Sequence, residues 1–300
     1  MIDIRYHIYS IAAVFFALAV GIVIGTSFAR SSPVGGAERR TIIRYENSMR
    51  SLKREIEKTA EDNARKAQIA KNCEEFCRAA LPSIAKNRLL GRNVAIVQTG
   101  DYDDLSGNVK LVLELAGAHV NSVTDINRLF PWDDDTKIAA ALTHCGIAPP
   151  SDPKEARNKL FSVFAGMLYA GQYQLLASRF EESKVAKFTG EYGRVNRLIV
   201  IVGGTESEPT FSPQHIDSQL ISQLDAPDVT IVGCEGSQAV GSYISAWHKT
   251  GIATVDNVDS AIGQMALICA LNGENAQFGT KENADRLIPH TLEPPMGVAR

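Results

Sequence analysis

The sequence predicts an α/β protein in which an N-terminal transmembrane helix and a coiled-coil helix precede a Rossmann-like domain with a mostly parallel sheet. An apolar run opens the chain, a polar segment with a heptad register follows, and short apolar runs then alternate with helical patterns. We place the anchor at residues 1–30, a hinge and coiled-coil stalk at 31–88, and the α/β domain at 89–300, with a helical insertion at about residues 131–196.

The anchor is predicted from residues 8–29, which carry no charged side chain and are flanked by Arg5 and Arg30. A hydrocarbon core about 30 Å thick needs roughly 20 apolar residues in a helix, so the run fits one span. Small residues line one face of this helix, where a second helix can approach closely. They are Ala13, Ala17, Gly21 and Gly25. A cleaved secretory signal ending at the small-x-small residues 27–29 is the alternative, but the length of the run favours retention.

The composition is that of an ordinary globular protein. Of the 300 residues, 45% are hydrophobic and 22% are charged, with a net charge of −3, so we expect no nucleic-acid partner. The charge bias around the span does not decide its orientation. Arginines after the span favour a cytoplasmic C-terminal part, yet large domains are translocated largely regardless of charge.

The stalk is predicted from a heptad pattern that follows a helix break at residues 31–36, SSPVGG. The a and d positions are Ile42, Tyr45, Met49, Leu52, Ile56, Thr59, Asn63, Lys66, Ala70, Cys73, Cys77 and Ala80. This seam is strong up to Ile56 and weak beyond it. Asn63 at an a position favours a parallel pairing, so we expect a homodimer through a two-stranded coil that ends at Pro82.

Two cysteines, Cys73 and Cys77, lie one helical turn apart on this predicted seam and are the candidate metal ligands. In a dimer four thiols would converge, and soft thiolates suit Cu(I) or Zn. Interchain disulfides and a purely apolar role in the coil are the alternatives. The other three cysteines, Cys145, Cys234 and Cys269, are widely separated, and the sequence has no CxxC pair.

The α/β domain is predicted from short apolar runs without period-two alternation, which are typical of parallel strands covered on both faces. The expected strands are residues 94–97, 119–124, 198–202, 229–232 and 252–255. The expected helices are residues 104–116, 152–180 within the insertion, 213–224, 242–249 and 260–271.

Ligands of such sheets bind at the loops after the strands, here residues 100–104, 203–208 and 233–238. These loops contain neither GxGxxG nor a P-loop, so nucleotide binding would rest on fold analogy alone. Asp101 and Asp103 only loosely match the aspartate pair of phosphoryl-transfer enzymes, and we expect them to be capping residues.

Other catalytic patterns are weak. We expect Asp133, Asp134 and Asp135 to begin a helix rather than bind a cation, and His144 and Cys145 to be loop or core residues rather than metal ligands. Ser237 lacks the GxSxG turn that exposes a nucleophile. The sequence therefore favours a protein that is not an enzyme.

Several segments resemble the MctB family of copper transport proteins, and the resemblance spans nearly the whole chain. They are IDIRYHIYSIAAVFFALAVGIVIG, GRNVAIVQTG, LAGAHVNSV and GIATVDNVDSAIGQMALICALNGENAQFGTKENADRLIP. The most specific part is TVDNVD at residues 254–259, with Gly263 in the following helix and the late segment 279–289.

The resemblance implies a single-pass protein of the cell membrane whose C-terminal domain is extracytoplasmic and which serves copper efflux or homeostasis. Copper would be its cargo, and the resemblance implies no resident cofactor. SteB-like members imply an alternative role, that of a dimeric scaffold that regulates cell-wall hydrolysis together with envelope or cell-wall proteins. The span carries no intramembrane charge of the kind that marks ion pathways.

Overall fold

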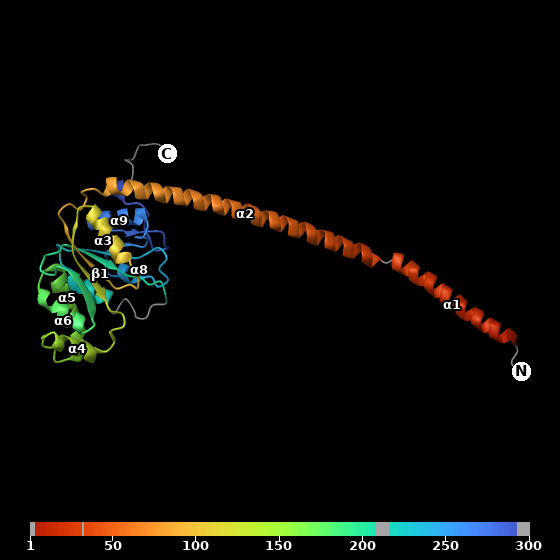
Figure 1. Cartoon of the computed structure of the whole chain (residues 1–300), viewed down its shortest axis with the longest axis horizontal. Helices are drawn as coiled ribbons and strands as arrows, with labels where there is room; N and C mark the ends of the chain where they lie inside the picture. Colours follow the sequence, from red (N-terminus) through yellow and green to blue (C-terminus); the bar gives the residue numbers. More distant parts are fainter. Residues whose placement is uncertain (1–3, 32, 208–215, 293–300) are drawn as a thin grey trace. The chain divides into compact units, whose positions relative to one another are not determined.

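The computed structural model describes residues 4–31, 33–207 and 216–292 of the chain. It divides into two units, residues 1–71 and residues 72–300, and each is described by itself. The first unit contains helix α1 (Ile4–Ser31) and most of helix α2 (Pro33–Ala85). The second contains the last turns of α2 and the α/β domain (Figure 1).

Helix α1 is long and apolar enough to cross a membrane. Its stretch Tyr6–Phe28 has 23 residues with a mean hydropathy of 2.5, and none of it is buried within the chain. A soluble helix with so many uncovered apolar side chains would be costly in water, at about 25 cal/mol for each Å² of apolar surface. The length and composition expected of a membrane anchor are therefore present.

The predicted hinge is shorter than expected, because α2 begins at Pro33 and includes Val34, Gly35 and Gly36. Ser32, between the two helices, lies outside the described residues. Proline is well tolerated at the first helical position, where its missing N–H has no intrahelical acceptor to lose. The prediction of a break over residues 31–36 was therefore wrong for Ser31, which ends α1, and for residues 33–36.

Pro82 was predicted to end the coil, but helix α2 continues through Pro82 to Ala85. Leu81 and Ala85 on either side of it are buried in the core of the α/β domain, whereas Pro82 itself is exposed. Proline within a helix costs about 3 kcal/mol. Burial of the neighbouring side chains offsets that cost and keeps the helix intact.

The sheet has seven strands in the order β3-β2-β1-β4-β5-β6-β7. They are β1 (Asn93–Gln98), β2 (His119–Ile126), β3 (Ala186–Gly190), β4 (Leu198–Val202), β5 (Thr230–Cys234), β6 (Ala253–Val255) and β7 (Gln277–Phe278). All neighbouring pairs are parallel except β2–β3. The five predicted strands are confirmed with shifted ends, and the prediction for β4 has the right bounds.

Helices cover both faces of the sheet, which explains the uninterrupted apolar runs. The helices are α3 (Leu105–Leu115), α4 (Asp135–His144), α5 (Ala156–Tyr169), α6 (Ala177–Glu182), α7 (Asp217–Leu224), α8 (Ile244–His248) and α9 (Ala261–Leu271). Successive β4 residues alternate between two cores. Leu198 and Val200 pack in the core with α3, α9 and the end of α2, and Ile199 packs in the core with α4, α5, α7 and α8.

The predicted insertion contains more structure than the sequence indicated. The helix expected over residues 152–180 is interrupted after α5, where Gly171 has a φ of +65° and Tyr173 a φ of +55°. Short 3-10 turns occur at Pro153–Glu155 and Gln174–Leu176, and another at His290–Leu292. The edge strand β3 was not predicted. Of the helix expected over residues 213–224, residues 213–215 lie outside the described residues and α7 begins at Asp217.

The chain folds back over the β7 edge of the sheet. The Asp285 amide donates to the Gln277 carbonyl (2.8 Å), and the Gly279 amide donates to the Arg286 carbonyl (3.0 Å). Phe278 and Arg286 form an isolated bridge. The short strand β7 is therefore bordered by its own following segment.

Pro82→Ala should raise the free energy of unfolding of the full chain by roughly 1–3 kcal/mol, because it restores an amide donor inside an intact helix. Chemical denaturation in detergent, followed by the fluorescence of Trp132 and Trp247, measures this change. Ser83→Ala, an exposed neighbour, is the control and should change it by less than about 0.5 kcal/mol. A clear loss of stability in Pro82→Ala would contradict the interpretation.

Candidate functional site

The two predicted thiol ligands occupy different environments near the end of α2. Cys73 is exposed, and Cys77 is half-buried one turn before the buried Leu81. Cys145, Cys234 and Cys269 are buried, and burial raises the pKa of each of these three thiols. A raised pKa makes the thiolate, which is the metal-binding form, harder to reach at these three cysteines. Their burial also shields them from solvent. Of the five thiols, a metal ion in solution can therefore reach only Cys73 and, in part, Cys77 without unfolding of the domain.

The end of α2 is attached to the α/β domain by hydrogen bonds as well as by apolar packing. The Glu74 Oε1 atom accepts a hydrogen bond from the Ala261 amide at the first turn of α9 (3.0 Å), where a negative charge is favourable. The Glu74 carboxylate also pairs with Arg78 (3.1 Å). Asn272, after α9, donates to the carbonyl of Arg88 (3.0 Å). The side of α2 that carries Glu74 is thus covered by its own domain.

The strand-end loops meet at the carboxyl edge of the sheet, as predicted. β1 continues to β2 on one side and neighbours β4 on the other, so the loops after β1 and β4 separate there. A crevice of about 320 Å³ lies at this position. Its lining residues are Tyr102, Asp103, Asp104, Leu105, Asn108, Glu206, Gly236, Gln238 and Asp259. Four carboxylates and no cationic side chain line it, so it does not suit a phosphate or a dinucleotide.

Asp101 joins two loops rather than capping a helix. Asp101 accepts hydrogen bonds from the Glu206 amide (2.8 Å) and the Ser207 hydroxyl (3.0 Å), and pairs with Arg128 at 3.4 Å. The N-cap position of α3 is Asp104, which makes no side-chain capping bond. The expected capping role of Asp101 was therefore wrong, because the loop after β4 offers closer donors.

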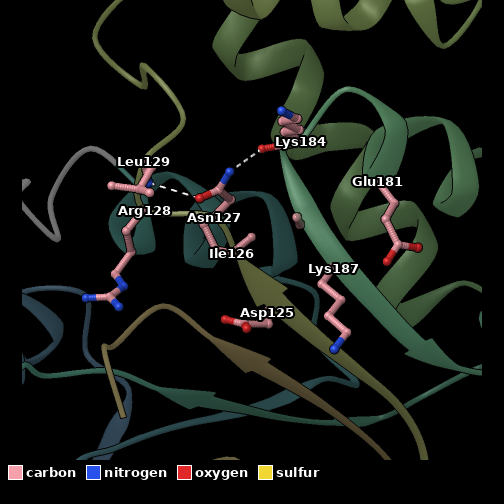
Figure 2. Close-up of a pocket in the computed structure, with 9 residues that line it drawn as sticks. Asp125, Ile126, Asn127, Arg128, Leu129, Glu181, Lys184 and Lys187 are labelled. Carbon is pink, nitrogen blue, oxygen red and sulfur yellow. Dashed lines mark hydrogen bonds between the residues drawn. The ribbon is translucent and has the colours of Figure 1, made fainter. Parts of the chain in front are cut away.

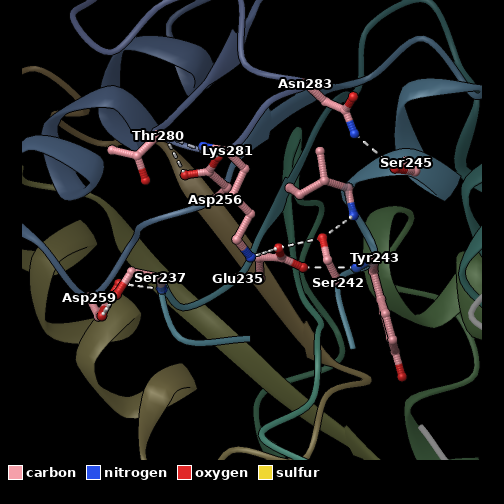
Figure 3. A network of polar contacts seen from close by, with 11 residues as sticks. Glu235, Ser237, Ser242, Tyr243, Ser245, Asp256, Asp259, Thr280, Lys281 and Asn283 are labelled. Atoms are coloured by element: carbon pink, nitrogen blue, oxygen red, sulfur yellow. Dashed lines mark hydrogen bonds and ion pairs between the residues drawn. The ribbon is translucent and has the colours of Figure 1, made fainter. Parts of the chain in front are cut away.

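A buried polar network lies beside this crevice (Figure 3). The Glu235 side chain has no exposed surface and accepts hydrogen bonds from the Ser242 hydroxyl (2.7 Å), the Tyr243 amide (2.8 Å) and the Lys281 ammonium group. Burial raises the pKa of Glu235, and the bond from Lys281 lowers it in part. Removing one partner of such a pair would leave an uncompensated buried charge, so the network holds the loop after β5 against the segment after β7.

The same region brings together the two segments that carry the most specific sequence signature. Asp256 accepts hydrogen bonds from the amides of Thr280 (2.9 Å) and Lys281 (2.7 Å). Gly263 lies so close to the chain before α9 that an added Cβ would stand 2.0 Å from the Asn257 carbonyl oxygen, so only glycine fits there. Sequence reasoning missed Glu235 and Lys281 because 46 residues separate them.

A second hollow of about 500 Å³ lies where β2 ends and β3 begins (Figure 2). Asn127 connects the two segments, donating to the Lys184 carbonyl (2.7 Å) and accepting from the Leu129 amide (3.0 Å). The charged residues that line the hollow are Asp125, Arg128, Glu181, Lys184 and Lys187. Because both signs of charge are present in similar number, the hollow does not select an anion or a cation.

The remaining predicted residues have structural roles. Asp134 caps α4 by accepting hydrogen bonds from the amides of Thr136 (3.0 Å) and Lys137 (3.2 Å), which confirms the expected helix start. The exposed His144 lies 3.4 Å from Glu182, while Cys145 is buried. Within the described part of the chain, no three His, Cys, Asp or Glu side chains are arranged to hold a metal ion.

The chain matches the family described as "Copper transport outer membrane protein, MctB" over residues 1–289. The chain belongs to the MctB family. Its relatives named "Copper transporter MctB" include one from Mycobacterium tuberculosis (strain ATCC 25618 / H37Rv), 22% identical over 316 residues that cover 95% of this chain and 98% of the relative. Another, from Mycobacterium leprae (strain TN), is 24% identical over 320 residues with the same coverage.

One buried carboxyl outside the crevice, that of Asp217, has a raised pKa. Asp217 is fully buried, and its Oδ2 atom accepts hydrogen bonds from Trp247 Nε1 (2.8 Å) and Thr99 Oγ1 (3.2 Å). Its Oδ1 atom has no hydrogen-bond partner among the described residues. Burial raises the pKa of this carboxyl from 3.8 to about 7, and the two hydrogen bonds limit the rise.

Asp217→Asn should flatten the pH dependence of stability. The folded protein keeps the Asp217 proton up to about pH 7, whereas the unfolded chain loses it near 3.8. Folding therefore takes up a proton between these values, and the free energy of unfolding falls by up to about 1.4 kcal/mol per pH unit as the pH rises. Denaturation at pH 5 and pH 8 should show a difference smaller by on the order of 2 kcal/mol in the variant.

Asp225→Asn, at an exposed carboxyl that follows the same helix, is the control and should retain the wild-type difference between the two pH values. An unchanged pH dependence in Asp217→Asn would show that the buried carboxyl is ionised throughout this range.

Proposed function

We propose that this chain is a membrane-anchored envelope protein that takes part in copper efflux or homeostasis and does not catalyse a reaction. The observation that carries the proposal is the family match over residues 1–289, which includes the apolar helix α1 as well as the α/β domain. One helix cannot enclose an aqueous pore, so movement of copper across a membrane would require several copies or a partner. We place the α/β domain outside the cytoplasm.

Copper, as cargo, would be held by Cys73 and Cys77. Both are on α2, and they are the two thiols of the five that are not buried. Neighbouring residues at i and i+4 lie on the same side of a helix, about 5–6 Å apart at Cβ, which allows two sulfur atoms to approach one ion. Cu(I) prefers soft sulfur ligands, whereas the side chains of the acidic crevice offer carboxylate, amide and phenol oxygens.

The alternative is a dimeric coiled-coil scaffold that regulates cell-wall hydrolysis through envelope or cell-wall proteins. A specific observation favours it. In residues 42–56 of α2, the first stalk segment, the a and d side chains are uncovered in the single chain, with exposed fractions from 53% to 71%. These are Ile42, Tyr45, Met49, Leu52 and Ile56. Such a helix gains stability by burying this face, and a second parallel copy provides a matching one.

Replacing both Cys73 and Cys77 by serine should abolish Cu(I) binding by the purified full chain, because hydroxyls are poor ligands for a soft ion. Competition with a chromophoric Cu(I) chelator measures the binding, and a deletion strain carrying the variant should be as copper-sensitive as the deletion itself. Met49→Leu removes an exposed thioether from the same helix and is the control. Wild-type binding by the double variant, or normal copper tolerance of the deletion strain, would argue against the copper role.

Leu52→Asp combined with Ile56→Asp should weaken self-association of the full chain in detergent at least 100-fold, because two carboxylates would enter an apolar seam. Sedimentation equilibrium measures the dissociation constant. Ser51→Asp combined with Glu55→Asp alters the same turns away from the a and d positions and should change it less than threefold. For the scaffold role, crosslinking in cells should also capture a membrane or cell-wall protein, and finding none would count against that role.

A further inference from the structure

The last turns of α2 present two different faces. On one face, Glu74 accepts a hydrogen bond from the first turn of α9, and Leu81 and Ala85 are 6% and 0% exposed. These three residues follow a spacing of seven and four, so they lie on one side of the helix. The chain's own α/β domain covers this side.

A second face is apolar and mostly uncovered. Cys73, Phe76 and Ala80 follow at spacings of three and four residues, and they form what we call the distal stripe. At 100° per residue, the stripe is centred roughly 130° around the helix from the side that faces the domain. Cys73 is exposed, Ala80 is half-buried and Phe76 has 74% of its surface exposed. A phenylalanine so exposed leaves its ring in water within the single chain.

Cys77 does not belong to this stripe. The heptad pattern of the sequence places Ala70, Cys73, Cys77 and Ala80 on one seam. In the structure Cys77 is half-buried, on the flank between the stripe and the side that carries Leu81. The uncovered apolar position one residue earlier is Phe76. The face that is free to meet a partner is therefore shifted by one residue from the predicted seam.

We propose that the distal stripe packs against the distal stripe of a second copy of this chain in a parallel arrangement. The inference deepens the dimer of the proposed scaffold function and rests on it. In a two-fold symmetric, parallel pair of helices, equivalent residues at core positions face each other across the axis. Cys73 thus faces Cys73 of the second copy, while Cys77 remains against its own domain.

The surface area that a stable dimer must bury supports a second copy of this chain as the partner of the distal stripe. The five seam side chains between Ile42 and Ile56 expose 53–71% of their surface. At roughly 100–150 Å² each they offer on the order of 600 Å² per copy, less than the about 800 Å² per partner of a specific interface. Phe76 and its neighbours in the stripe add on the order of 200 Å², which closes this gap.

Oxidation of the native thiols tests the register directly. Diamide oxidises two close thiols to one disulfide, and the two electrons and two protons pass to its N=N bond. Disulfide formation requires the two Cα atoms to be within about 7 Å, which core positions of a two-stranded coil allow and flanking positions on opposite outer sides do not. The full chain in detergent is treated with diamide and examined on a non-reducing gel, with sedimentation measured in parallel.

Cys77→Ser should crosslink to a dimer as fast as the wild type, and Cys73→Ser should crosslink at least tenfold more slowly. Crosslinking of Cys73→Ser but not of Cys77→Ser would overturn the stripe while leaving the dimer intact. If sedimentation shows a dimer but neither variant crosslinks, the distal stripe would likewise be overturned and the dimer would remain. A monomer by sedimentation would overturn both the stripe and the dimer on which it rests.

Phe76→Ala provides a second test that does not depend on thiols. It should raise the dimer dissociation constant at least tenfold and leave the unfolding midpoint of the α/β domain unchanged, because the ring is exposed within one chain. Glu75→Ala, at the neighbouring position outside the stripe, should change the dissociation constant by less than twofold. Equal effects of the two substitutions would contradict the proposed contact.

Discussion

The burial of Leu81, Ala85 and Leu89 beneath α3 and α9 is the contact on which the rest of the arrangement depends. It continues a polar helix into an apolar core, past a proline that would otherwise end it. It also determines which side of the last turns of α2 is covered, and therefore which side is left for another molecule. The hydrogen bond from the first turn of α9 to Glu74 adds a directional contact to this apolar packing. Because a hydrogen bond requires a particular geometry, it restricts rotation of α2 about its own axis.

Much of the fold could be predicted because its strongest signals are local. The apolar run of α1 and the fully covered strand β4 follow directly from composition and from the absence of alternation. Pro82 misled the prediction because its local preference is outweighed by burial of Leu81 and Ala85 in a core whose other residues lie far away in the sequence. Strand β3 was missed for the opposite reason. It is a short edge strand whose residues are mostly partly exposed, so it lacks the apolar run that marks the central strands.

The candidate site was predictable in position but not in content. Parallel topology alone places the loops after β1, β4 and β5 at one edge of the sheet. The pairing of Glu235 with Lys281 depends on how the chain returns from β7, which no spacing in the sequence records. The resulting edge is acidic, and its polar groups bond to one another, so these groups serve as a rigid support. The groups best suited to a soft ion lie instead on α2, in Cys73 and Cys77.

The two outer strands of the sheet have a consequence for crowding. Copies of an anchored protein share a surface, where their local concentration is far higher than in free solution. A long bare strand at the rim of each domain would then invite neighbours to join sheet to sheet. Here one rim is the five-residue antiparallel β3 and the other is the two-residue β7, bordered by Asp285 and Arg286. Such blunted rims discourage open-ended stacking of sheets between neighbouring copies.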